Sequence, residues 1–321
     1  MILLIADPDD RHADALETAL RKKGTETFRF HPEDLPLTAT VTLHPGSPHV
    51  PGLLQSEQGM LSLERVRTVW MRTYRGFSLP PEWSPVAKQY AQAECTETVS
   101  GLYLHLRERF WVNPPWRLRH GADNRALQLR AAQESGLEIP PTLVTTDPHA
   151  ALEFFRECQG QVLRLRMKLS PPASARAAAP EKALTLESLQ DAELFRRAPV
   201  MLQQTTPGVT KVRVAVIGCR LFAAALPARP TGKPRAARAS KLQPHTLPEP
   251  LGTACLAVVR RLGLASAILE LGLTDGDRYV FLGIDARGDW LPLEREARLP
   301  VLDALAEMLR QGKTDFEWAG G

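Results

Sequence analysis

A β-hairpin in the second half of the chain is the feature that most limits its possible folds. Residues 211–217 and 220–226 are mostly apolar runs joined at Gly218-Cys219. Runs of this kind around a short glycine-containing turn are typical of a hairpin. Two further strand-like runs follow at 266–273 and 278–284, separated by a polar turn. Because antiparallel strands with intervening helices define an α+β arrangement, the C-terminal part is predicted to be α+β.

The N-terminal part has a different pattern, in which short apolar runs alternate with helices. Residues 2–6 are apolar, and Asp7-Pro8 provides the residues that favour the start of a helix. Short βα units of this kind predict an α/β fold. We therefore expect an α/β domain over residues 1–115, a central subdomain over 116–198 and a C-terminal subdomain over 199–321.

Composition excludes several classes of protein. The 321 residues contain 40 Lys and Arg against 36 Asp and Glu, and this net charge of +4 gives no reason to expect nucleic-acid binding. No apolar stretch approaches the roughly 20 residues of a membrane span. The apolar run at the start is too short for a signal peptide. A cytoplasmic protein with no membrane partner is expected.

Two basic segments are candidate anion-binding regions. In the apolar run 162–169, Arg164, Arg166 and Lys168 alternate with apolar residues and are expected to share one strand face. That face could be solvated, or it could bind phosphate. Residues 227–241 are also basic and contain no acid. This segment could be a solubilising linker or a groove for an acidic peptide.

Two acids near the C-terminus are candidate metal ligands. Glu270 and Asp285 lie in neighbouring strand-like runs, so their side chains can meet on one face of a sheet. Magnesium takes one or two carboxylates together with substrate phosphates. A structural acid bonded to Arg213 or Arg287 is the equally plausible alternative. Gly283 stands where a further acid would complete a metal site.

From Val69 to Leu309 the chain resembles the ATP-grasp ligases that cyclise ribosomal peptides, known as microviridin or graspetide maturases. The order and spacing of several stretches match, whereas the first 65 or so residues are less similar. The matching stretches are VWMR (69–72), FWVNPP (110–115), DNRALQLRAAQESGLEIPPTLVTTDP (123–148), APVMLQQ (198–204), VRVAVIGCRLFAAAL (212–226), LQPHTLPEP (242–250) and RRLGLASAILELGLTDGDRYVFLGIDARGDWLPLE (260–294).

The resemblance implies an ATP-grasp fold preceded by a pre-ATP-grasp domain, with ATP and Mg²⁺ as cofactors. Such enzymes form an acyl phosphate from a side-chain carboxylate, and a hydroxyl or amine then displaces the phosphate. Arg213 matches the catalytic arginine of the hairpin, and Lys211 stands where an acid is expected. The positions that the resemblance assigns to ATP are Arg125, one or more of Arg164, Arg166 and Lys168, and the hinge residues Gln203 and Gln204.

The metal site implied by the resemblance departs from the family pattern. Glu270 takes the place of the first magnesium carboxylate, Gly283 that of the bridging acid, and Asp285 that of an asparagine. This predicts a degenerate site that holds at most one metal ion and has impaired catalysis. The alternatives are a pseudoenzyme or partner subunit without ligase activity, and a ligase for small molecules.

The resemblance also implies a peptide partner. We expect an acidic segment of a ribosomal precursor peptide to meet Arg235, Arg238 and Lys241 in the basic segment. The protein could form a homodimer, or pair with an intact ATP-grasp protein.

Overall fold

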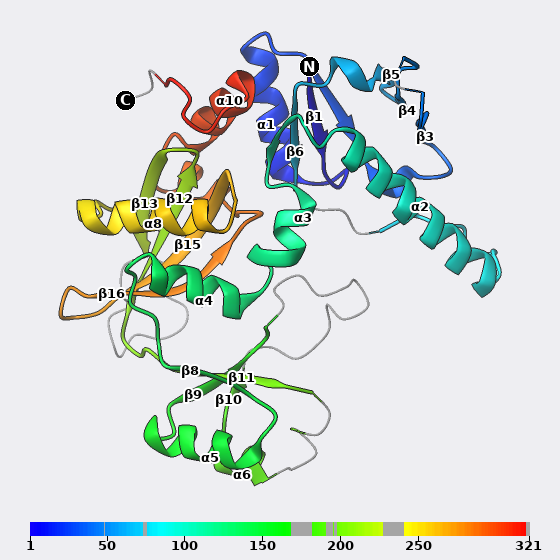
Figure 1. Ribbon diagram of the computed structural model, residues 1–321. Coiled ribbons are helices and arrows are strands. Elements are labelled where there is room, and N and C mark those ends of the chain that lie inside the picture. Colours follow the sequence, from blue (N-terminus) through cyan, green and yellow to red (C-terminus); the bar gives the residue numbers. More distant parts are fainter. Residues whose placement is uncertain are drawn as a thin grey trace.

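The computed structural model describes residues 1–47, 49–72, 76–167, 182–190, 195, 198–226 and 241–318. Lys168, Arg235 and Arg238, three residues predicted to bind ligands, lie outside these ranges. In Figure 1 the N-terminal domain lies at the top beside the C-terminal helix, and the central subdomain lies at the bottom. The C-terminal sheet lies between them.

The N-terminal domain is built on a parallel sheet with strand order β2-β1-β6-β7. Chain order reverses at β1, because β2 pairs on one side of it and β6 on the other. Ligands of open α/β sheets bind beyond the carboxyl ends of strands at such a reversal. The elements are β1 (Ile2–Ile5), α1 (Arg11–Lys22), β2 (Thr27–Phe30), η1 (Pro32–Asp34), η2 (Leu63–Arg65), β6 (Thr68–Met71), α2 (Pro85–His105) and β7 (Phe110–Val112).

Residues 31–60 are rich in Pro, Gly and His, which predicts loops with one short strand at 39–43, but the structure forms a small antiparallel sheet there. The predicted strand is present as β3 (Thr40–Thr42), but β4 (Leu53–Ser56) and β5 (Gly59–Ser62) pair beside it. Leu54 and Leu61 form a cross-strand pair and are almost fully buried, which anchors this sheet in the N-terminal core. Runs of four residues carry too little alternation to be recognised as strands.

The central subdomain contains an antiparallel sheet with strand order β10-β9-β11-β8. β9 is shorter than predicted, because it ends at Leu165 rather than at residue 169. β11 lies beyond residue 198, the predicted end of the central subdomain, yet it pairs with β8 and β9 of that subdomain. The domain limits stay a prediction. The elements are α3 (Pro115–Arg117), η3 (Leu118–Ala122), α4 (Arg125–Glu134), β8 (Thr142–Thr145), α5 (Pro148–Glu157), β9 (Val162–Leu165), β10 (Lys182–Ala183), α6 (Leu186–Gln190) and β11 (Val200–Gln204).

The C-terminal subdomain contains the predicted hairpin in a sheet with order β14-β13-β12-β15-β16. Gly218 at the hairpin turn has a φ of 57°, and a Cβ there would lie 2.2 Å from the carbonyl oxygen of Thr314. Glycine is therefore required at this turn. The elements are β12 (Thr210–Ile217), β13 (Arg220–Leu226), β14 (Gln243–Pro244), α8 (Glu249–Arg261), β15 (Ser266–Leu273), β16 (Tyr279–Asp285), α9 (Leu291–Arg295) and α10 (Val301–Gln311).

Hydrophobic packing leaves one region of this sheet open to polar chemistry. Val212, Val214 and Phe281 point to the face covered by α4 and α8. On the other face, Ala215 and Ile268 belong to the core shared with α10 and α1. That core does not extend to the other end of this second face, where charged residues of the same strands lie.

Candidate nucleotide and metal site

The open end of the C-terminal sheet brings together most of the residues predicted for catalysis and metal binding. Glu270 of β15 pairs with Arg213 of β12 on one side and with Gly283 of β16 on the other. Directly paired residues of antiparallel strands share a face. Asp285 lies two residues beyond Gly283 on β16, opposite Ile268, and is therefore on the same face. Glu270 and Asp285 are both exposed there.

A β-bulge sets this register. The pairing shifts between Glu270 and Leu271, so that Leu282 has no partner on β15. The carbonyl oxygen of Leu282 instead accepts a hydrogen bond of 3.2 Å from the guanidinium of Arg125. Bulges commonly re-aim side chains next to active sites.

Gly283 is not required by the backbone. A Cβ built at this position would meet nothing within 4 Å, and its φ lies outside the left-handed region. The position can therefore accept a side chain, and glycine there removes a possible ligand without serving the fold.

The alternative prediction, that Glu270 or Asp285 pairs with Arg213 or Arg287, is wrong, because the side chains of both arginines have other partners. Arg287 forms two hydrogen bonds with Asp123, of 2.6 and 3.0 Å, and Arg213 contacts Asp289. Asp285 accepts a hydrogen bond of 2.9 Å from the backbone amide of Arg287. Across the described ranges, neither Glu270 nor Asp285 takes part in an ion pair between side chains.

Arg125 joins the two subdomains at the start of α4. Asn124 caps this helix by accepting hydrogen bonds from two backbone amides. The backbone amide of Arg125 donates to the carbonyl oxygen of Met167, at 2.8 Å, and its side chain reaches β16. The residue therefore lies between the end of the β9 segment and the metal-site strand.

The remaining predicted nucleotide residues are less closely grouped. Arg164 and Arg166 are exposed, as expected from their alternation. Gln203 is buried, and its side-chain amide donates to the Thr142 hydroxyl at 3.0 Å, so this side chain serves the central sheet. Gln204 is half-buried at the end of β11, and Lys241 is exposed just before β14.

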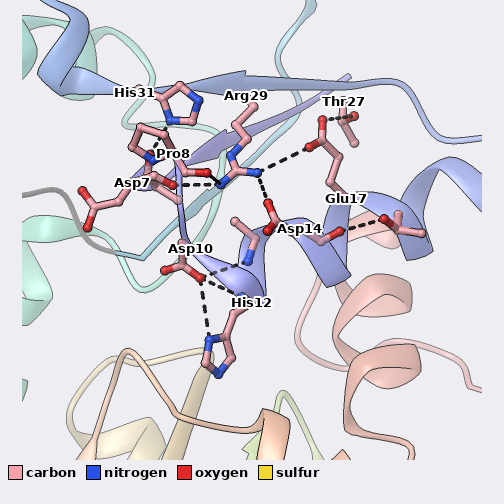
Figure 2. Close-up of polar contacts among 12 residues, drawn as sticks. Asp7, Pro8, Asp10, His12, Asp14, Glu17, Thr27, Arg29 and His31 are labelled. Carbon is pink, nitrogen blue, oxygen red and sulfur yellow. Dashed lines mark hydrogen bonds and ion pairs between the residues drawn. The ribbon is translucent and has the colours of Figure 1, made fainter.

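Four residues that were not predicted connect the N-terminal domain to this site. Arg72, after β6, donates to the Asp10 carboxylate at 2.7 Å and to the carbonyl oxygens of Arg287 and Gly288. His12 Nε2 lies 3.1 Å from Asp289 Oδ1. Asp10 also caps α1, as Figure 2 shows. The helix start predicted at Asp7-Pro8 is wrong, because α1 begins at Arg11 and Asp10 is its cap. The sequence also does not show that Arg72 and Asp289, far along the chain, are partners of Asp10 and His12.

These contacts depress the pKa of both carboxyl groups. Burial alone would raise the pKa of Asp10, but the hydrogen bond with His12 and the charge of Arg72 hold it well below its usual range. The hydrogen bond with His12 lowers the pKa of Asp289, against the effect of burial, and Arg213 adds to the lowering. Both acids are therefore ionised partners of the arginines at neutral pH.

Two buried amides hold the start of β15 and the end of β16 in place. Asn113 donates to the carbonyl oxygen of Ser266 at 2.7 Å and accepts from the amide of Ala265 at 3.0 Å. Gln128 donates to the carbonyl oxygen of Ile284 at 2.9 Å and accepts from its amide at 3.2 Å. The positions of Glu270, Gly283 and Asp285 are thus fixed by residues from the other domains.

The residues present fit one magnesium ion with a phosphate-bearing ligand. Glu270 and Asp285 match the one or two carboxylates that magnesium takes beside phosphates. No group of three or more His, Cys, Asp or Glu that could hold a metal ion occurs among the residues that the structure describes. The buried Nε of Arg213 has no acceptor in the same ranges, and a ligand oxygen would satisfy it.

Fold and site together define an ATP-grasp protein. Residues 1–119 match the family model of the MvdD pre-ATP grasp domain. The macrocyclase MdnB from Microcystis aeruginosa MRC is 30% identical, with a TM-score of 0.82 and coverage of 96% of this chain and 98% of that one. This chain therefore belongs to the ATP-grasp macrocyclases of the graspetide type, and the predicted family and fold class are confirmed.

Two further solved structures extend the comparison. Macrocyclase MdnC from the same organism, bound with precursor peptide MdnA, is 26% identical, with a TM-score of 0.87 and coverage of 97% of this chain and 100% of that one. A RiPP-associated ATP-grasp ligase from Chryseobacterium gregarium, in complex with ADP and leader and core peptides, is 20% identical, with a TM-score of 0.80 and coverage of 97% and 96%. At that identity it supports the fold alone. A comparison with curated proteins gave no match.

No helix in the described ranges is long and apolar enough to cross a membrane.

Proposed function

We propose that this protein is an ATP-dependent peptide ligase that modifies a ribosomal precursor peptide, with catalysis weakened by an incomplete metal site. The proposal is carried by one observation: Arg213, Glu270 and Asp285 share one open sheet face on which Gly283 contributes no ligand. Solved relatives described as macrocyclases bound with precursor peptide, or as ligases with Mg and ADP, support the choice of substrates.

The chain's own residues have separate tasks in this proposal. Glu270 and Asp285 would hold one Mg²⁺, which neutralises phosphate charge when bound. Arg213 would bind and orient the phosphoryl group that is transferred to a carboxylate of the peptide, with ADP as the leaving group. An amine or hydroxyl of the same peptide would then displace phosphate to give an amide or an ester.

Arg125 and the exposed Arg164 and Arg166 would contribute positive charge toward the nucleotide phosphates. The acidic part of the peptide would meet Lys241 and the basic segment that precedes it in the sequence. Charge complementarity of this kind mainly sets the association rate and the specificity.

The test is an incubation of purified protein with Mg-ATP and the precursor peptide encoded beside its gene. Mass spectrometry should show the loss of one water per bond formed, together with ADP release. Calorimetry should show ATP binding with a dissociation constant between about 1 μM and 1 mM. Absence of heat and of any thermal shift at several millimolar Mg-ATP would remove nucleotide from the proposed function.

A second candidate function follows from Gly283 itself. Because a bridging ligand is missing where a side chain would fit, the protein could instead be a partner subunit that grips a peptide for an intact ATP-grasp enzyme. In that case peptide binding would be retained without ADP release. Ligation would appear after addition of the intact enzyme.

A further inference from the structure

Asp289 lies between the N-terminal domain and the predicted catalytic arginine. Its Oδ1 is 3.1 Å from His12 Nε2, at the beginning of α1. Its backbone carbonyl oxygen accepts a hydrogen bond of 2.9 Å from Arg213, and its Oδ2 lies 3.8 Å from the same guanidinium. One residue is therefore held from both sides, by a histidine of one domain and by an arginine of another.

The His12 side chain has little freedom to leave this arrangement. The residue is 9% exposed, and its ring meets Trp290 edge-on with centroids 4.9 Å apart. Its Nδ1 lies 3.6 Å from Asp10 Oδ1. Asp10 is itself held by the helix cap and by Arg72. Both nitrogens of the His12 ring thus have polar partners, and Trp290 packs against the ring.

The β1–α1 loop, which precedes His12, is held in place by contacts with β2. Arg29 of β2 is buried and donates to the carbonyl oxygens of Asp7 and Pro8, at 2.8 and 3.0 Å. Figure 2 shows this guanidinium between the β1–α1 loop and the acids of α1. The position of His12 is therefore set by the N-terminal sheet.

Arg213, in contrast, has a long side chain whose only described polar partner is Asp289. Its side chain is 19% exposed, and its Nε has no acceptor within the described ranges. Ordering an arginine side chain costs rotamer entropy. A group that holds the guanidinium in advance reduces the part of this cost that ligand binding must offset.

We propose that His12 is a positioning residue for Arg213 and acts on it through Asp289. This inference rests on the proposed role of Arg213 toward the transferred phosphoryl group. The N-terminal domain then takes part in phosphoryl transfer through this contact. Arg72 supports the same geometry, because it holds the carbonyl oxygens of Arg287 and Gly288 directly before Asp289.

The proposal predicts a selective effect on nucleotides. AMPPNP contains the terminal phosphoryl group that Arg213 would bind, whereas ADP lacks it. Loss of the His12 contact should therefore weaken AMPPNP binding and lower kcat, and it should leave ADP binding nearly unchanged. A purely structural role would affect both nucleotides alike, or would affect stability alone.

The experiment compares His12→Phe, His12→Gln and Lys23→Met in the full-length protein. Phenylalanine keeps a ring beside Trp290 but removes both nitrogens, and glutamine keeps a polar group that can reach Asp289. Lys23 is the matched control, because it joins the other end of α1 to Asp303 of α10 at 2.7 Å. The readouts are the dissociation constants of Mg-AMPPNP and Mg-ADP by calorimetry, kcat where turnover occurs, and Tm.

We expect His12→Phe to weaken AMPPNP about tenfold, with ADP within about twofold, and His12→Gln to recover most of the loss. Lys23→Met should lower Tm without changing the ratio of the two constants. An unchanged ratio in His12→Phe, or an equal loss for both nucleotides, overturns the proposal.

If His12→Phe does not fold, Asp289→Asn replaces it, because the backbone carbonyl toward Arg213 remains while the contacts of the carboxylate with His12 and Arg213 are lost. The same shift in ratio is expected, and an unchanged ratio again overturns the proposal. A shift in ratio without any turnover in the native protein would support the positioning role and contradict the proposed ligase. Failure of the native protein to bind either nucleotide would overturn both.

Discussion

Glu270 on β15 lies directly opposite Gly283 on β16, on the sheet face that also carries Arg213. The position at which the family resemblance expects a bridging acid is therefore next to a carboxylate and beside open space. The departure from the family pattern at position 283 is therefore the absence of one carboxylate side chain.

Gly283→Glu should create a stronger metal site. Without metal, a further carboxylate beside Glu270 and Asp285 adds like-charge repulsion and should lower Tm slightly. With Mg-ATP the variant should gain more thermal stability than the native protein, because a ligand that binds only the folded state stabilises it. Thermal shift assays with and without Mg-ATP provide the measurement.

Gly283→Gln is the matched control, since it adds a similar volume without charge. A Mg-dependent gain in Gly283→Gln equal to that in Gly283→Glu would show that bulk, and not coordination, is responsible. Identical responses of the native protein and Gly283→Glu would place residue 283 away from any metal.

Arg287→Ala should destabilise the protein, because Arg287 forms two hydrogen bonds with Asp123, whose side chain is 7% exposed. Breaking a largely buried pair from one side typically costs about 3 kcal/mol or more. Urea unfolding gives the free energy. Arg65→Ala removes an exposed pair with Glu26 and should have little effect. Equal effects of the two changes would contradict the importance of the Asp123 contact.

Acid should weaken the contact between the domains. The pKa values of Asp10 and Asp289 are lowered in the folded state, so their ionised forms stabilise it above the unfolded pKa of about 3.9. This stabilisation is lost as the pH falls below about 4 toward the folded pKa values. The free energy of unfolding should decline less steeply with falling pH in Asp10→Asn than in the native protein. It is measured between about pH 6 and about pH 3, a range that spans the pKa of Asp in the unfolded chain.

Asparagine is chosen at this position because it keeps the helix cap while it removes the charge. The exposed turn residue Asp275 supplies the control, and Asp275→Asn should decline like the native protein. If the free energy of unfolding of Asp10→Asn declined with pH as steeply as that of the native protein, the contacts of Asp10 with His12 and Arg72 would contribute nothing to the acid dependence.

The basic segment should control peptide binding. Replacing Arg235, Arg238 and Lys241 together by Ala should weaken the binding of an acidic precursor peptide and reduce its dependence on salt, since exposed charges are screened within about 8–10 Å. Fluorescence anisotropy at several salt concentrations would measure this. Replacing the exposed Arg65, Arg107 and Arg109 of the N-terminal domain removes the same charge elsewhere. A similar loss of binding in both triple variants would indicate a general charge effect.

Local patterns in the sequence were sufficient to predict the elements of the site. The apolar runs of β12, β13, β15 and β16 appear in the structure, and Gly218 makes the predicted turn. The short strands β4 and β5 were missed, because their pairing in the N-terminal core outweighs a weak local pattern.

What the sequence by itself determined was which residue types stand at the ends of which strands, including glycine at position 283. Only the tertiary structure decided that Glu270 pairs with Gly283, and that His12 meets Asp289 across 277 positions of the chain. Strand propensity and helix capping act between near neighbours. Register and contacts between domains depend on the simultaneous packing of distant segments, as the bulge at Leu282 and the loop held by Arg29 show.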